Sequence, residues 1–256
     1  MHANVVPVSG VDEPVDATWY KGIIGALNYL ALMTRPDISY ALSVLASKCT
    51  SPTVGDIRRV KHLFRYVMST RHIGLNFKHD SDFQLHVWAD ASYASRDGAR
   101  SQSGYCFSLG ANNAAFYVKS TKQQLVTLSS TESEYVAMFH SSTEAVFLKR
   151  LMEHLDFPQA PIVVYQDNQS TIHWVQGKEN FHRAKHLEVK YHYVRQLLRE
   201  HVIAVEYLET TEMIADVLTK PLVSDHFQYL ACGLLGIYTF EERISEEGFQ
   251  DVSLSM

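Results

Sequence analysis

Apolar residues in the first third of the chain recur at helical spacing. They follow a period of three to four residues over 23–31, and again after Pro36, a residue suited to the first position of a helix. A third stretch starts behind Thr53, whose hydroxyl group can cap a helix N-terminus, and repeats at i, i+3, i+4 and i+7 through Val60, Leu63, Phe64 and Val67. This pattern predicts three helices that each bury one face.

Beyond about residue 74 the period shortens to two. Apolar and polar residues alternate at Leu75 and Phe77, and again from Leu85 up to Asp90, as in half-buried strands, and we expect the second of these strands to end at Asp90. Later segments typical of strands lie at 104–110, 115–118, 161–165 and 202–208, and segments typical of helices lie at 131–155, 169–176, 185–201 and 211–219. This order predicts an α/β fold with a mixed sheet, which combines antiparallel hairpins with parallel crossings and carries flanking helices.

Composition places the chain among globular proteins with a real core. It has 256 residues, of which 46% are hydrophobic and 20% charged, enough for one large domain or two modest ones. Its three cysteines lie far apart, which favours neither a zinc site nor a disulfide framework and fits a reducing compartment. The N-terminal residues lack the apolar core of a signal peptide, and no run of about 18 apolar residues occurs, so we expect no membrane partner.

Charge is distributed unevenly along the chain. The net charge is −5, yet residues 57–79 hold six basic residues and no acid, and residues 178–199 hold six more against two acids. Basic runs are often only the solvated faces of helices. Two of them in an otherwise acidic chain favour a surface that faces phosphate groups.

Four acidic residues stand out because each lies in a separate segment at the expected edge of a strand or helix: Asp90, Glu134, Asp167 and Asp216. Carboxylates from distant parts of a chain can build a site for a hard cation such as Mg²⁺, and two such ions about 4 Å apart can act on both oxygens of a phosphodiester. Each acid also has a simpler interpretation. Asp90 could be a turn residue, Asp167 a helix cap and Asp216 a solvated side chain.

Glu134 has the sharpest local alternative. With Thr131 it forms the capping-box spacing, in which a glutamate only returns to the backbone at the start of its own helix. A first-turn glutamate on a helix packed against the sheet could instead point across at Asp90. Glu132 competes for that place, and spacing alone does not decide between the two.

Several motifs in unbroken order resemble a known family. They are YKGIIGALNYL at 20–30, TRPDISYA at 34–41, SSTESEYVA at 129–137, DNQS at 167–170, KHLEVKYH at 185–192 and ADVLTKPL at 215–222. Together they are similar to the C-terminal part of copia-type retrotransposon polyproteins, where the end of reverse transcriptase runs into ribonuclease H. The similarity covers about residues 18–222. It implies a ribonuclease H-like fold and cleavage of the RNA strand of an RNA–DNA hybrid.

The resemblance also implies roles for individual residues. By position, Asp90 matches the first metal-bridging aspartate of the family, Glu134 rather than Glu132 matches its glutamate, and Asp167 and Asp216 complete the set. The implied cofactors are two Mg²⁺ ions, with Mn²⁺ as a substitute. Many relatives carry a second acid two residues after the first aspartate; this chain has Ser92 there, which leaves the inferred set intact.

Domains and partners follow from the same resemblance. Residues 1–78 resemble a helical thumb or connection region of reverse transcriptase, 79–222 the ribonuclease H-like domain, and 223–256 form a C-terminal tail that resembles nothing known. The polymerase motif Tyr-x-Asp-Asp is absent, so we do not expect the chain to synthesise DNA alone. The expected partners are an RNA–DNA hybrid and the polymerase part of the same polyprotein, inside the cell, either in the cytoplasm or in the nucleus. The oligomeric state stays open. Candidate contacts to nucleic acid are Ser130, Asn168, Gln169, Arg183, Lys185 and His186.

Two other functions compete with the nuclease hypothesis. One is a domesticated, non-catalytic module that keeps the fold and binds nucleic acid or protein; four converging carboxylates argue against it. The other is a transposase or integrase nuclease. Those enzymes usually place their glutamate last among three acids, whereas in this chain it comes second.

Overall fold

The structure is a computed structural model that describes residues 13–79, 83–177 and 188–237. Its N-terminal part is helical, as the sequence predicts. The helices there are α1 (Ala17–Met33), the 3₁₀ turn η1 (Pro36–Ile38), α2 (Ser39–Ala46) and α3 (Val54–Ser69). Thr53 caps α3 through a complete capping box with Asp56, which confirms the predicted N-terminus. Pro36 begins the 3₁₀ turn rather than α2 itself.

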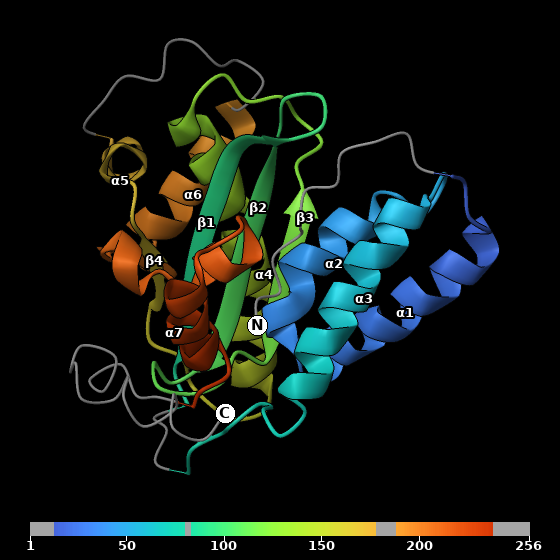
Figure 1. Ribbon diagram of the computed structural model, residues 1–256. Helices are drawn as coiled ribbons and strands as arrows, with labels where there is room; N and C mark the ends of the chain where they lie inside the picture. Colours follow the sequence, from blue (N-terminus) through green and yellow to red (C-terminus); the bar gives the residue numbers. More distant parts are fainter. Residues whose placement is uncertain (1–12, 80–82, 178–187, 238–256) are drawn as a thin grey trace.

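A five-stranded mixed sheet follows. Its strands are β1 (Leu85–Arg96), β2 (Arg100–Leu109), β3 (Tyr117–Lys122), β4 (Ile162–Gln166) and β5 (Ile203–Tyr207), in the spatial order β3-β2-β1-β4-β5 (Figure 1). The pairs β1–β2 and β2–β3 are antiparallel, while β1–β4 and β4–β5 are parallel. The prediction of antiparallel hairpins joined to parallel crossings is therefore confirmed.

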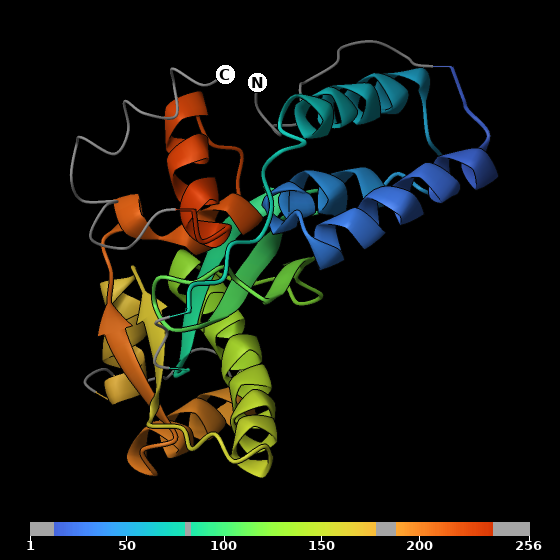
Figure 2. The ribbon, with the colours of Figure 1, turned by 90° about the horizontal axis from the view of Figure 1, so that it is seen from below.

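Both faces of the sheet are covered, because successive side chains of β1 point to opposite sides. On one face, Val87 and Ala89 pack in a cluster with residues of α4 (Ser130–His154), α5 (Gln169–Gln176) and α6 (Glu188–Arg199). On the other face, Trp88 packs in a second cluster. That cluster joins α1–α3 to the 3₁₀ turn η4 (Ile214–Leu218) and to α7 (Ser224–Leu234). Figure 2 shows the blue and cyan helices α1–α3 beside the sheet, next to the red helix α7.

The TRPD motif holds the helical part together. Arg35 and Asp37 are buried, and the Arg35 guanidinium lies 2.7 Å from an Asp37 carboxylate oxygen. The Tyr66 hydroxyl donates to the same oxygen at 2.6 Å, and Arg35 donates to the backbone and side-chain oxygens of Thr70 at 3.0 and 2.8 Å. Because Tyr66 and Thr70 belong to the C-terminal end of α3, this cluster fixes α3 against η1. The motif therefore has a structural role in this chain.

Several predicted strand and helix boundaries are wrong. No strand forms at Leu75 and Phe77; there the backbone makes isolated bonds, from the Asn76 amide to Leu235 and from Ala114 to Asn76, instead of a ladder. Asp90 does not end a strand, since β1 continues to Arg96 opposite β2. The strands expected at 104–110 and 115–118 are displaced to the ranges of β2 and β3.

The last predicted helix is also different. Residues 211–219 form the two short 3₁₀ turns η3 (Thr210–Glu212) and η4 rather than an α-helix, and residues 224–234 of the predicted tail form α7. Within the three described ranges, no helix combines the length and the apolar character needed to cross a membrane.

Candidate active site

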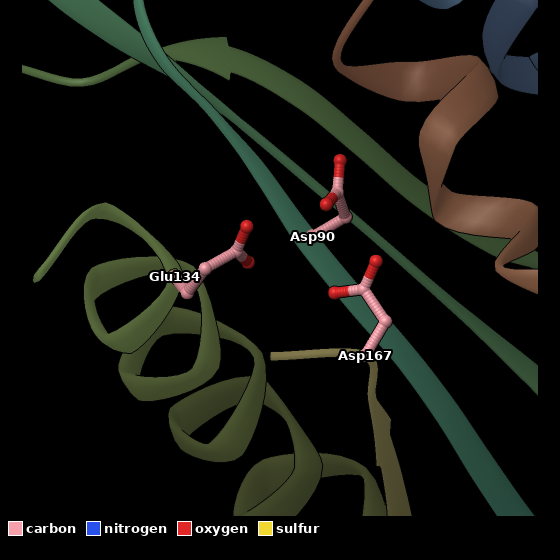
Figure 3. A group of neighbouring side chains, drawn as sticks. All are labelled: Asp90, Glu134 and Asp167. Carbon is pink, nitrogen blue, oxygen red and sulfur yellow. The ribbon is translucent and has the colours of Figure 1, made fainter. Parts of the chain in front are cut away.

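Three carboxylates from three separate elements meet beside the neighbouring strands β1 and β4. Asp90 lies on β1, Glu134 in the first turns of α4, and Asp167 directly after β4. One oxygen of each lies within 4.8 Å of the others, and Figure 3 shows the three carboxylates turned toward one another. The parallel pairing of β1 and β4 explains the meeting of the two aspartates. Its last register pair is Trp88 with Tyr165, and Asp90 and Asp167 each lie two residues further on.

Helix capping decides between the two glutamates. The cap of α4 is Ser129, whose hydroxyl accepts from the Glu132 amide at 3.1 Å, and the Glu132 carboxylate turns back to accept from the Leu128 amide at 2.7 Å. Glu132 therefore serves the start of its own helix. Glu134 points across to the sheet, where its Oε2 accepts from the Ala91 amide at 2.9 Å. Glu132 thus takes the capping role that the sequence allows for Glu134.

Hydroxyl groups from one segment orient both aspartates. Thr219 donates from its Oγ1 to Oδ2 of Asp90, and Thr210 donates to Oδ2 of Asp167 at 2.8 Å. Both threonines belong to the stretch that contains η3 and η4. That stretch lies over the face of the sheet opposite α4, so the carboxylates are held from two sides.

Asp216 lies apart from the compact group. It is buried in η4, and the three-carboxylate group does not include it. Its Oδ1 lies 2.8 Å from the ammonium of Lys220, one helical turn further along the chain. Burial raises the pKa of the Asp216 carboxyl, and the nearby charge of Asp90 raises it further. Asp216 is therefore coupled to Asp90 and Asp167 by charge, although it lies outside the compact group.

The close approach of η4 depends on a glycine. Gly104 of β2 is the register partner of Asp90. A Cβ atom at this position would lie 2.6 Å from Cβ of Leu218 and 2.6 Å from Cγ2 of Thr219. The missing side chain thus makes room for the segment that brings Thr219 to Asp90.

The site holds more negative charge than the protein compensates. Burial raises the pKa of Glu134 well above its ordinary value, and Asp90 and Asp167 raise it further, while the Ala91 amide and Lys220 act in the opposite direction. Burial and Asp90 likewise raise the pKa of Asp167, against the Thr210 hydroxyl and Lys220. A cation bound between these carboxylates would relieve that repulsion.

Two of the expected nucleic-acid contacts flank this group. Ser130 is exposed at the first position of α4, and Gln169 is exposed at the first position of α5. The two helix starts are joined by a bond of 3.4 Å from the Thr171 hydroxyl to the Thr131 carbonyl. The third, Asn168, uses its side-chain oxygen to cap α5 through the Thr171 amide at 3.0 Å.

The first basic run, 57–79, lies within the described residues, whereas part of the second, 178–199, does not. Arg183, Lys185 and His186 lie outside the described residues. The first run includes Arg58, Lys61 and Arg65, which are exposed on α3. That helix lies on the β3 side of the sheet in Figure 1, whereas the carboxylates lie at β1 and β4.

Sequence reasoning missed the groups that support the acids. Thr210, Thr219 and the Ala91 amide carry no local signal, because each acts on a residue far away in the chain or in another element. Lys220 had a signal: it follows Asp216 at the i, i+4 spacing of a helical ion pair.

Comparisons with known proteins identify relatives of this chain. It is 34% identical over 218 residues to the Retrovirus-related Pol polyprotein from transposon RE1 of Arabidopsis thaliana, which covers 84% of this chain and 15% of that protein. It is 33% identical over 221 residues to the corresponding polyprotein from transposon TNT 1-94 of Nicotiana tabacum, with 86% of this chain and 16% of that protein covered. The chain thus spans about 15% of the length of these curated relatives. No protein-family model matches the chain.

Solved structures that match this chain include ribonucleases H. LC11-RNase H1 in complex with an RNA/DNA hybrid matches with a TM-score of 0.41 and 14% identity over 53% of this chain and 94% of that one. The N-terminal RNase H domain of a Mycobacterium tuberculosis protein matches with a TM-score of 0.42 and 15% identity over 58% and 96%. The mixed five-stranded sheet with helices on both faces confirms the predicted α/β fold class. The chain belongs to the copia-type retrotransposon Pol polyproteins and corresponds to one segment of them.

Proposed function

We propose that the chain is a ribonuclease H, which hydrolyses the RNA strand of RNA–DNA hybrids with the help of divalent metal ions, and that it works as part of a retrotransposon reverse transcriptase. The observation that carries this proposal is the meeting of Asp90, Glu134 and Asp167, with oxygens within 4.8 Å of one another, in a chain related to Pol polyproteins. A non-catalytic module has no need for three mutually repelling carboxylates in one place.

The donor set fits a hard cation. The group contains only carboxylate oxygens, which Mg²⁺ prefers and Mn²⁺ also accepts. The raised pKa values of Glu134 and Asp167 reflect negative charge that a divalent ion would compensate. When two ions are bound, they supply activation of a water molecule and stabilisation of the leaving 3′ oxygen.

The protein's own residues would hold the ions and orient the carboxylates. Asp90 would contribute to both ion positions, and Thr219 fixes one of its oxygens. Glu134 and Asp167 would hold one ion, and the Ala91 amide and the Thr210 hydroxyl fix their carboxylates. Asp216 would help to hold the other ion once its carboxylate turns from Lys220 toward Asp90.

Preference for RNA would come from contacts to 2′-hydroxyl groups across a shallow minor groove. Ser130 and Gln169 are exposed at the starts of α4 and α5, next to the carboxylates, and suit this role. Because α3 exposes Arg58, Lys61 and Arg65, we propose that it follows phosphates of the DNA strand, so binding should weaken steeply as salt is added.

We propose the domain division 1–78, 79–222 and 223–256 from the family resemblance. A single apolar cluster nevertheless joins α1–α3 to η4 and α7. The first part would connect the nuclease to the polymerase part of a polyprotein.

Cleavage of a labelled RNA–DNA hybrid in Mg²⁺ tests the proposal, with the wild type compared with Asp167→Asn. The variant removes one carboxylate and no volume, so we expect hybrid cleavage to fall at least a hundredfold while the fold is kept. Asp156→Asn is the matched control, since Asp156 is exposed just beyond the C-terminal end of α4. If the wild type binds the hybrid tightly but never cuts it in Mg²⁺ or Mn²⁺, the chain is a non-catalytic binding module instead.

A further inference from the structure

Lys220 brings a positive charge into the acidic site. It directly follows Thr219, the residue that donates to Asp90, and its Nζ lies 2.8 Å from Oδ1 of Asp216. The Asp216 side chain is 2% exposed and that of Lys220 only 32%. Among the ion pairs of the described residues, this is the one that includes an acid of the site.

The influence of this ammonium reaches all four acids. Burial alone would lower the pKa of Lys220, yet its pKa is raised, because Asp90, Asp216 and Asp167 stabilise the charged form. In return, Lys220 acts to lower the pKa of Glu134, Asp167 and Asp216. The ammonium, 2.8 Å from Asp216 and next in sequence to the residue that donates to Asp90, is therefore a positive charge within the acidic site.

We propose that Lys220 is the resident counter-ion of the acidic site, where it holds Asp216 outside the three-carboxylate group and competes with a divalent cation for the negative charge of the site. The inference rests on the proposed function only in taking Asp90, Glu134 and Asp167 as the cation-binding group. Lys220 is a positioning residue in this account, because it acts through Asp216 and needs no contact with the substrate.

Competition between the Lys220 ammonium and a divalent ion predicts the direction in which the metal affinity changes when the lysine is removed. A bound divalent ion repels the ammonium, and the ammonium stabilises the metal-free protein. Removal of the lysine charge therefore strengthens cation binding from both sides, and uptake of protons by the carboxylates only reduces the gain. A side chain that merely supported the fold would have the opposite effect, because its loss would loosen the site and weaken binding.

The test measures binding of Mn²⁺ to the full chain without nucleic acid, from the electron paramagnetic resonance signal of the free ion. Three variants are compared with the wild type. We expect Lys220→Met to bind Mn²⁺ about tenfold more tightly. Lys220→Arg keeps the charge and should stay close to the wild type. Lys149→Met is the matched control, because Lys149 forms the same i, i+4 pair with Glu153 at 2.9 Å on the far part of α4.

Thermal melting gives a second readout. Metal-free Lys220→Met should melt at a lower temperature than the wild type, and saturating Mg²⁺ should raise its melting temperature by more than it raises that of the wild type. Should Lys220→Met not fold, Asp216→Asn and the double variant Asp216→Asn/Lys220→Met carry the same comparison. The double variant should bind Mn²⁺ more tightly than Asp216→Asn alone. Unchanged or weaker Mn²⁺ binding after loss of the lysine would overturn the inference.

Failure of this inference and failure of the proposed function look different. A wild type that cuts the hybrid, together with a Lys220→Met variant whose Mn²⁺ affinity is unchanged, overturns only the role of Lys220. A Lys220→Met variant with tighter Mn²⁺ binding, together with a wild type that never cuts the hybrid, overturns only the nuclease.

Discussion

Gly104 lies directly opposite Asp90 in the β1–β2 ladder, and the absence of a side chain at Gly104 admits the segment whose Thr219 donates to Asp90. The geometry of the acidic site thus depends on Gly104, which has no functional group of its own. The pairing links the antiparallel half of the sheet to the placement of the carboxylates.

Gly104→Ala should separate η4 from the sheet. The added methyl group would meet Leu218 and Thr219 at 2.6 Å, so the segment must shift, at a cost of about 1–3 kcal/mol in the free energy of unfolding. Hybrid cleavage should fall with it, because Thr219 loses its place beside Asp90. Denaturant unfolding and the cleavage assay measure the two effects. Gly74→Ala is the control, since nothing lies within 4 Å of a Cβ there, and equal behaviour of the two variants would contradict this prediction.

Thr219→Val should show how much the Thr219 hydroxyl group contributes to the free energy of unfolding. The substitution keeps the shape of the side chain and leaves a buried oxygen of Asp90 without its donor, which costs about 1–3 kcal/mol of stability in the metal-free protein. We expect a lower midpoint in urea unfolding in the presence of a chelator, whereas Thr219→Ser should recover most of the loss. If the serine variant is no better than the valine variant, packing rather than hydrogen bonding explains the threonine.

Asp37→Ala should destabilise the protein through its helical part. It would leave the buried guanidinium of Arg35 uncompensated, at a cost of about 3–5 kcal/mol. The exposed pair of Lys48 and Asp97, 3.2 Å apart, is the comparison, and Asp97→Ala should cost at most about 1 kcal/mol. Calorimetry would measure both. A mild effect of Asp37→Ala would argue that the TRPD motif serves some purpose other than stability.

Local signals explain what the sequence predicts well. The start and end of α5 match the prediction because both are set locally, by the Asn168 cap and by Gly177, which adopts the left-handed conformation with φ of 75°. Thr53 predicts the start of α3 for the same reason. At 75–77 the alternation was too short to show whether a partner strand would form, and none does.

Contacts between distant segments explain what the sequence does not predict. The bond from Thr219 to Asp90 joins residues 129 positions apart, so no window of sequence contains it. The choice between Glu132 and Glu134 depends on which residue caps α4, and the cap is Ser129 rather than Thr131. The family resemblance selected Glu134 by position, and the geometry supplies the physical reason.

The stability of the metal-free protein should fall as the pH rises, because of two buried carboxyl groups, Glu134 and Asp216, and a partly buried one, Asp167. Burial, followed by the charge of neighbouring acids, raises the pKa of Glu134, Asp167 and Asp216, for Asp216 to about 8. In the unfolded chain such groups titrate near about 4. The folded state therefore binds these protons more tightly than the unfolded state does. The stability that they contribute is fully present below the unfolded values and is lost as the pH rises through the folded values.

Removal of one of these groups isolates the effect from the rest of the titration. Between about pH 4 and pH 8 the free energy of unfolding of the wild type, measured with a chelator present, should fall relative to that of Asp216→Asn. Asp225→Asn changes an exposed aspartate of α7 and should run parallel to the wild type. Saturating Mg²⁺ should reduce the difference at high pH, because a bound cation favours the ionised carboxylates. Parallel curves for the wild type and Asp216→Asn would mean that the buried carboxyl of Asp216 titrates as it does in the unfolded chain, and that the acids do not form one electrostatic site.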